Sequence, residues 1–175
     1  MQEYPNLLLV SGTGRNTGKT TLICSILKKF SFQHKIIAIK ITPHFHDVNQ
    51  EFIILKNENY IISEENNINT KKDSSLMLKN GASKVYFVQV LDDFLEEAIS
   101  FLLKHINKDI LIICESARLR KIIKPGVFIL LNSKNELEKN KDLFNFADKI
   151  ATIENIETII ESLSFKNKNW HLKKL

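Results

Sequence analysis

Residues 14–22 read GRNTGKTTL and contain a Gly-Lys-Thr tripeptide of the kind that binds phosphate groups. In such a loop the backbone N–H groups converge on the phosphates of a nucleotide, and Lys19 would neutralise the β- and γ-phosphate charge. The hydroxyl of Thr20 would ligate Mg²⁺, and that of Thr21 would bond the α-phosphate. A chance Gly-rich turn between a strand and a helix is the alternative. The expected nucleotide-binding residues are Gly14, Arg15, Asn16, Thr17, Gly18, Lys19, Thr20 and Thr21.

The spacing of the glycines indicates a subtype of this loop. The common pattern G-x-x-x-x-G-K-[ST] places its first glycine at position 13, which is Thr13 here. Glycine is available one place earlier, at Gly12, and one place later, at Gly14. The stretch GTGRNTGKT shares the spacing G-T-x-x-x-x-G-K-T with some phosphate-loop enzymes and in this respect resembles dethiobiotin synthetase. We therefore interpret the stretch as a phosphate-binding loop of an unusual subtype.

A carboxylate that could work with this loop ends an apolar stretch further along the chain. The segment DILIICES, residues 109–116, places Glu115 where a strand would end. A phosphate loop usually works with a carboxylate at such a place, which holds Mg²⁺ or its water. Thr20 and Glu115 are therefore the predicted magnesium ligands, and a strand-end acid that faces solvent is the alternative. The predicted catalytic residues are Lys19, Asp47 and Glu115.

Two histidines and an acid follow the second predicted strand. The stretch KITPHFHDV contains His44, His46 and Asp47, and ligands of open α/β sheets gather beyond the carboxyl ends of the strands. We expect this cluster to contact the magnesium nucleotide or a substrate. A transition-metal site and a solvated pair of loop histidines are the alternatives, because two histidines alone do not define a closed metal site.

Apolar runs and helical periodicities alternate along the chain and predict an α/β fold. Short apolar runs predict buried strands, and apolar residues at helical spacing predict amphipathic helices. Strands separated by helices indicate a mostly parallel sheet with helices on both faces, like that of P-loop NTPases, in a single P-loop nucleotide-binding domain over residues 1–175. The predicted strands cover residues 6–11, 35–41, 85–90, 109–116, 126–131 and 149–154. One predicted helix begins at Gly18 and a second follows a cap at Asp92 or Asp93. Two more are predicted over residues 134–146 and 157–163.

One segment interrupts this alternation and predicts an inserted β-hairpin. Two β-rich runs in residues 52–64 flank the polar turn KNEN. The expected faces of this ribbon hold Phe52, Ile54, Tyr60 and Ile62 on one side, and Ile53 and Ile61 on the other. A two-stranded ribbon is marginal alone and its parent sheet covers one face, so we expect a second copy of the chain to cover the other, as a homodimer. The alternative is that both faces fold onto the domain's own helices.

Composition argues against several other classes of protein. Apolar residues make up 43% of the 175 residues and charged residues 26%, as in an ordinary globular domain. The net charge of +5 is spread along the chain, so nucleic-acid binding is not expected. No run approaches the roughly 18 apolar residues of a membrane span, and the N-terminus lacks a basic region, which predicts a cytoplasmic protein without a membrane partner. Cys24 and Cys114 have apolar neighbours and are expected to be buried structural thiols.

Three motifs in a fixed order give a resemblance to a known family. The stretches GRNTGKTTL, IKITPHFHD and KKDSSLMLKNGASKVYFV follow one another along the chain. This order resembles the molybdopterin-guanine dinucleotide biosynthesis protein B (MobB) family over about residues 7–116. The matching residues are Lys40, His44, His46 and Asp47 after the second strand, Lys72, Asp73, Ser74, Gly81 and Ala82 in the helix motif, and Glu115. Ser116 stands where the family has glycine.

The resemblance implies a function, cofactors and partners. Members of the family bind GTP, hydrolyse it slowly, form dimers and assist guanylylation of the molybdenum cofactor. The expected cofactors are therefore Mg²⁺ and GTP, with ATP as the alternative nucleotide. The expected partner is a nucleotidyltransferase or another cofactor-biosynthesis protein.

Three other functions and one base-reading hypothesis stay open beside that reading. An ATP-dependent small-molecule kinase or ligase, in the manner of dethiobiotin synthetase, is the main alternative. The others are a metallochaperone GTPase that uses His44 and His46, and an interaction module that keeps nucleotide only as a structural element. One hypothesis is that NSKNE, residues 132–136, reads the guanine base, because the stretch follows the fifth strand, and a polar loop that arises by chance is the alternative.

Overall fold

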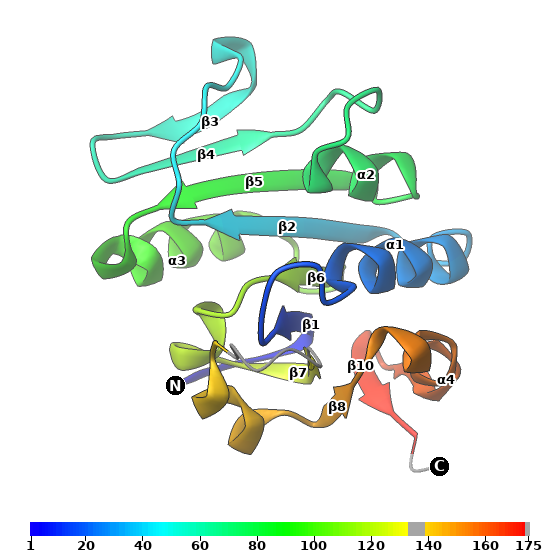
Figure 1. Cartoon of the computed structure of the whole chain (residues 1–175). Coiled ribbons are helices and arrows are strands. Elements are labelled where there is room, and N and C mark those ends of the chain that lie inside the picture. Colours follow the sequence, from blue (N-terminus) through cyan, green and yellow to red (C-terminus); the bar gives the residue numbers. More distant parts are fainter. Residues whose placement is uncertain (133–138, 174–175) are drawn as a thin grey trace.

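An eight-stranded sheet forms the centre of the protein, for which a computed structural model describes residues 1–132 and 139–173. The strand order is β3-β4-β5-β2-β6-β1-β7-β8 (Figure 1). Neighbours from β5 to β8 in this order pair in parallel, whereas β4 pairs antiparallel with both β3 and β5. The strands are β1 (Gln2–Gly12), β2 (Ile36–Thr42), β3 (Ile53–Lys56), β4 (Tyr60–Glu64), β5 (Lys84–Val90), β6 (Leu111–Glu115), β7 (Ile123–Leu131) and β8 (Lys149–Ala151). The predicted α/β class with a mostly parallel sheet is confirmed.

Helices cover both faces of this sheet, as the sequence predicts. Alternate residues of β1 point to opposite faces, so Leu8 and Val10 pack with α1, while Leu7 and Leu9 pack with α3. Because both faces are covered, β1 is a continuous apolar run and not an alternating one. The α-helices are α1 (Lys19–Phe30), α2 (Asp73–Lys79), α3 (Leu95–His105) and α4 (Ile156–Ser162), with α3 on one face and the other three on the opposite face.

The predicted hairpin is present and extends the sheet. β3 and β4 pair antiparallel, and β4 also pairs with β5. The side chains of Tyr60 and Ile62 are buried in the core beneath α3, on one face as expected. The ribbon is therefore an edge of the main sheet and not a free two-stranded unit.

Two residues assigned to the apolar face of the hairpin do not lie there. Phe52 ends a short 3-10 helix, η1 (Gln50–Phe52), and Ile54 is 46% exposed. Ile61, assigned to the other face, is only 9% exposed within the single chain. The domain thus covers most of the ribbon itself, which removes the physical reason given for a homodimer. The homodimer stays a prediction.

The N-terminal cap predicted at Asp92 or Asp93, for the helix that is α3 in the structure, is wrong. A 3-10 turn, η2 (Asp92–Phe94), precedes α3, and neither aspartate side chain caps a helix. Asp92 instead forms an ion pair with Arg118, which precedes another 3-10 turn, η3 (Leu119–Lys121).

The region after β7 departs further from the predicted elements. The helix predicted over residues 134–146 falls partly on residues 133–138, outside the described residues, and its described end forms a 3-10 helix, η4 (Lys141–Phe146). The predicted strand 149–154 ends at Ala151, because η5 (Ile153–Asn155) begins the turn into α4.

A C-terminal hairpin was missed from the sequence. Strands β9 (Leu163–Lys166) and β10 (Asn169–Leu172) pair antiparallel as a separate two-stranded sheet. Trp170 is 1% exposed, and its indole Nε1 donates to the carbonyl oxygen of Ile112 at 3.1 Å. The ring also meets Phe30 edge to face, with centroids 5.8 Å apart. This hairpin therefore closes the core beside α1.

The two cysteines are free thiols, as expected, although only one is fully buried. Cys114 is buried in β6 and Cys24 is half-buried in α1. Burial raises the pKa of the Cys24 thiol to about 11 and that of Cys114 still further, so both stay protonated at neutral pH. Within residues 1–132 and 139–173, none of the helices combines the length and apolar character needed to cross a membrane.

Gly126 marks a close approach between β1 and β7. A Cβ atom at this position would lie 2.0 Å from the carbonyl oxygen of Pro5, where the register of the two strands shifts. We expect Gly126→Ala to lower the free energy of unfolding by about 1–3 kcal/mol, measured by urea titration, because the backbone must move to admit the methyl group. Lys124→Ala, at an exposed position of the same strand, serves as the control and should change it by less than about 1 kcal/mol. A Gly126→Ala protein as stable as wild type would contradict the close approach.

Candidate functional site

The phosphate-loop stretch connects β1 to α1 at the carboxyl end of the parallel strands, as predicted. Asn16 and Gly18 adopt positive φ values of 57° and 91°, and the chain enters α1 directly after Gly18. Thr13 attaches the start of the loop to the neighbouring strand, since its backbone N–H donates to the carbonyl oxygen of Leu131 at 3.0 Å. Its hydroxyl donates to Asn132 Oδ1 at 3.1 Å. The loop is therefore held in a defined shape at the N-terminus of a long helix.

Gly12 lies where the loop folds back closely over the end of β1. A Cβ atom on Gly12 would lie 2.3 Å from Thr17 Oγ1 and 3.2 Å from Lys19 Nζ. The backbone carbonyl oxygen of Leu131 would lie 3.3 Å from the same atom. A larger residue at position 12 would therefore displace the Thr17 side chain, which favours glycine there.

The Lys19 ammonium lies over the loop that precedes it. Its Nζ donates to the Gly14 carbonyl oxygen at 2.9 Å and to Thr17 Oγ1 at 3.1 Å. Burial lowers the pKa of Lys19, and the nearby charge of Lys40 adds to this effect while the charge of Glu115 opposes it. Both hydrogen-bond acceptors are neutral oxygens, so a phosphate group would add a negative charge in direct contact with this ammonium group.

Lys40 is the centre of a charge network behind the loop. It stands opposite Glu115 in the register of β2 and β6, and its Nζ lies 2.6 Å from Glu115 Oε1. The same Nζ lies 2.7 Å from Asp73 Oδ2, at the first turn of α2. Burial alone would lower the pKa of Lys40, but the charges and hydrogen bonds of Glu115 and Asp73 outweigh it and raise that pKa above its usual value.

Asp73 links this network to the phosphate loop. Its Oδ1 accepts a hydrogen bond from the Thr20 hydroxyl at 2.9 Å. Burial would raise the pKa of Asp73, but hydrogen bonding and charge from Lys40, with the Thr20 hydroxyl, lower it. The carboxylate that is hydrogen-bonded to Thr20 is thus Asp73, whereas Glu115 lines the same cavity and acts on Lys19 through its charge.

The oxygen donors at this place suit a magnesium ion that is also bound by phosphate. Glu115 is 4% exposed, and its Oε2 is buried without a hydrogen-bond partner. Carboxylate and hydroxyl oxygens are the ligands that Mg²⁺ prefers. The described part of the chain holds no cluster of three or more His, Cys, Asp or Glu residues that would bind a metal ion. Magnesium would therefore be held by Thr20 and a nearby carboxylate together with the oxygens of a nucleotide.

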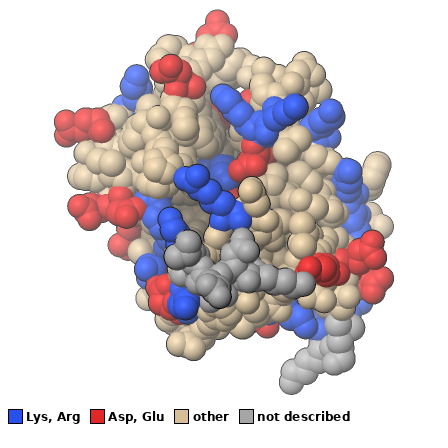
Figure 2. Space-filling view, viewed as in Figure 1, with Lys and Arg blue, Asp and Glu red and all other residues tan. Residues whose placement is uncertain are grey.

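A cavity of about 450 Å³ is lined by the loop together with Lys40, Asp73 and Glu115. Among the predicted nucleotide-binding residues, Gly14 and the exposed Arg15 do not line it. Lysine and arginine side chains border a hollow in the middle of this face (Figure 2). The lining residues are Asn16, Thr17, Gly18, Lys19, Thr20, Thr21, Lys40, Asp73, Glu115 and Ile153.

The His-x-His-Asp cluster lies outside this cavity. His44 and His46 are exposed, and Asp47 lines two neighbouring cavities that do not include the phosphate loop. The described residues give no support to a transition-metal site at the two histidines. The predicted catalytic role of Asp47 would require movement of its loop toward the phosphates. Of the proposed base-reading stretch, only Asn132 is described, and it binds Thr13.

Three residues of the site were not predicted as site residues. Lys40 and Asp73 matched family motifs only, and Ile153, which is 52% exposed, lies against Gly18. A lysine between two isoleucines near the end of the apolar run KIIAIKI was the available signal, because a lysine that is largely buried needs a carboxylate partner. Nothing in the sequence places Ile153 beside the loop.

Comparison of the chain with protein-family models, with curated proteins and with solved structures gives no match. The family resemblance therefore rests on the sequence motifs alone. The function has to be argued from the geometry of the site.

A double-mutant cycle tests the network around Lys40. Removing its ammonium group leaves the buried Glu115 without a counter-charge, so Lys40→Met should lower the free energy of unfolding by about 3–5 kcal/mol in urea titrations. Adding Glu115→Gln should recover most of that loss, because the uncompensated charge is gone.

A surface pair provides the control for this cycle. Lys84 binds Glu64 at 2.9 Å with half of its side chain exposed, and Lys84→Met should cost less than about 1 kcal/mol. The buried ion pair would be contradicted if the losses in unfolding free energy from Lys40→Met and Glu115→Gln were additive. A Lys40→Met protein as stable as wild type would contradict it as well.

Proposed function

We propose that this protein binds a purine nucleoside triphosphate together with Mg²⁺, with GTP as the expected nucleotide, and turns it over slowly or not at all. The observation that carries the proposal is the position of Lys19. Its ammonium lies over a glycine-hinged loop at the N-terminus of α1, beside the buried carboxylate of Glu115. Converging N–H groups, a lysine and a hydroxyl at a helix N-terminus form the usual receptor for a nucleotide's phosphates.

Slow turnover follows from how the two carboxylates of the cavity are engaged. Lys40 binds one oxygen of Glu115 and one of Asp73, and Thr20 binds the second oxygen of Asp73, so the carboxylates of this cavity are largely engaged in holding the site together. Asp47 lines other cavities. Rapid hydrolysis needs a group that orients the nucleophile, and here a partner protein or a rearrangement would have to provide it.

An accessory role in molybdenum cofactor guanylylation, with a nucleotidyltransferase as the partner, is the biological setting we propose from the motifs. The departure at Ser116 has a local role, since its hydroxyl accepts from the backbone N–H of Leu119 at 3.2 Å in the turn after β6. The chain is thus proposed as a divergent relative that keeps the nucleotide site.

A small-molecule kinase or ligase that uses ATP is the second candidate. It is favoured by one observation, a second cavity that shares Lys40 and Asp73 with the nucleotide cavity. Such a cavity offers space for an acceptor beside the terminal phosphate. A preference for ATP over GTP would favour this candidate.

Calorimetric titration with Mg-GTP tests the nucleotide site. Lys19→Ala removes a charged contact to the phosphates worth at least about 2 kcal/mol, so affinity should fall at least about thirtyfold while the fold is retained. Lys28→Ala, an exposed lysine on the same helix, should bind as wild type does. Equal affinities of wild type and Lys19→Ala, or no binding of either GTP or ATP by wild type, would rule out the proposal.

A further inference from the structure

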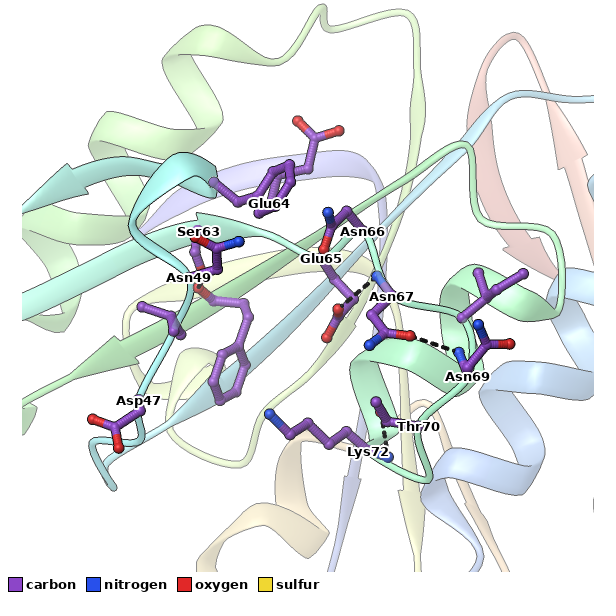
Figure 3. A pocket seen from close by; sticks show the side chains of 14 residues that line it. Asp47, Asn49, Ser63, Glu64, Glu65, Asn66, Asn67, Asn69, Thr70 and Lys72 are labelled. Carbon is purple, nitrogen blue, oxygen red and sulfur yellow. Dashed lines mark hydrogen bonds between the residues drawn. The ribbon is translucent and has the colours of Figure 1, made fainter.

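Two further cavities continue from the nucleotide cavity along the same face of the sheet. The first, of about 600 Å³, shares Lys40 and Asp73 with it. The second, of about 450 Å³, shares Asp47, Lys72 and Phe87 with the first (Figure 3). A molecule in the middle cavity would therefore lie directly across the Lys40–Asp73 pair from a bound nucleotide.

The middle cavity is lined by two carboxylates, Asp47 and Asp73, and by two lysines that form no ion pair among the described residues. Lys71 and Lys72 are exposed and line it, and within the described part of the chain neither ammonium group forms an ion pair or a hydrogen bond. Figure 3 shows the Lys72 side chain extending from the start of α2 across the outer cavity, toward the side on which Asp47 lies. The third lysine, Lys40, is already bound by two carboxylates. Lys71 and Lys72 are thus the groups available to bind an anion.

A flat apolar surface stands beside these lysines. Phe87 is half-buried on β5, and the ring of His46 lies nearly parallel to it, with centroids 6.4 Å apart and planes 26° apart. The loop that carries His46 is anchored, because the His46 backbone N–H donates to the side-chain oxygen of the fully buried Gln89. This wall is therefore held in place and offers packing for an apolar body.

We propose that the middle cavity binds a second substrate, a small organic anion whose carboxylate or phosphate group is held by Lys71 and Lys72 and whose apolar body packs on Phe87. Its position beside the terminal phosphate of a nucleotide rests on the proposed function, whereas the anion site itself does not. Asparagine side chains in the outer cavity, Asn66, Asn67 and Asn69, provide hydrogen-bonding groups for any part of the ligand that extends beyond Phe87.

Ligand-observed NMR titrations with phenyl phosphate, benzoate and benzyl alcohol test the site. Phenyl phosphate and benzoate separate the two possible anions, and benzyl alcohol has a similar apolar body without the charge. We expect at least one of the anions to bind with a Kd of about 1 mM and benzyl alcohol at least about tenfold more weakly. The double substitution Lys71→Ala/Lys72→Ala should weaken the anion at least about tenfold.

Matched variants separate this site from the phosphate loop. Lys79→Ala, an exposed lysine at the other end of α2, and Lys19→Ala should both bind the anion as wild type does. Phe87→Leu should weaken it severalfold, because a flat ring loses its partner. Binding that disappears in Lys19→Ala and survives in Lys71→Ala/Lys72→Ala would mean that the probe occupies the phosphate loop, and would overturn the proposal. Absence of binding by both anions would overturn it as well, whatever the result with Mg-GTP.

Discussion

The candidate site depends on the two ion pairs that the ammonium group of Lys40 forms. This group joins three elements that are distant in sequence, because β2 carries the lysine, β6 carries Glu115, and α2 carries Asp73. Asp73 in turn holds the Thr20 hydroxyl of the phosphate loop. A buried carboxylate is tolerated only when it is paired, so the parallel register of β2 with β6 and the docking of α2 are both required. Lys40 and Asp73 also lie between the cavity that we propose for a nucleotide and the cavity that we propose for a second substrate.

Much of the fold could be predicted where the physical signal was local. Continuous apolar runs identified buried parallel strands, and helical spacing identified α1 and α3. The C-terminal hairpin was missed because its turn uses Asn167 and Lys168, both at positive φ, in place of the usual Asn-Gly. The cap before α3 was misassigned because Arg118, far along the chain, binds Asp92. Such long-range partners have no local signature.

The candidate site divides along the same line. The strand–turn–helix placement of the candidate phosphate loop was predictable because the motif is short and contiguous. The loop's supporting charges were not, since Lys40 meets Glu115 only through strand register and Asp73 only through the docking of a helix. The spacing of the motif likewise left two glycines open, Gly12 and Gly14. The close approach of Gly12 to Thr17 comes from the way the loop folds back, which the sequence does not reveal.

The comparison of GTP and GDP binding with and without magnesium tests most directly the claim that Lys19, Thr20 and a carboxylate form a magnesium nucleotide site. Calorimetric affinities would be measured for both nucleotides in excess Mg²⁺ and in EDTA. EDTA would remove a magnesium ion held by Thr20 and a carboxylate, and because such an ion would also neutralise the terminal phosphate, GTP affinity should fall more than GDP affinity. Equal loss for the two nucleotides, or no loss, would contradict the claim.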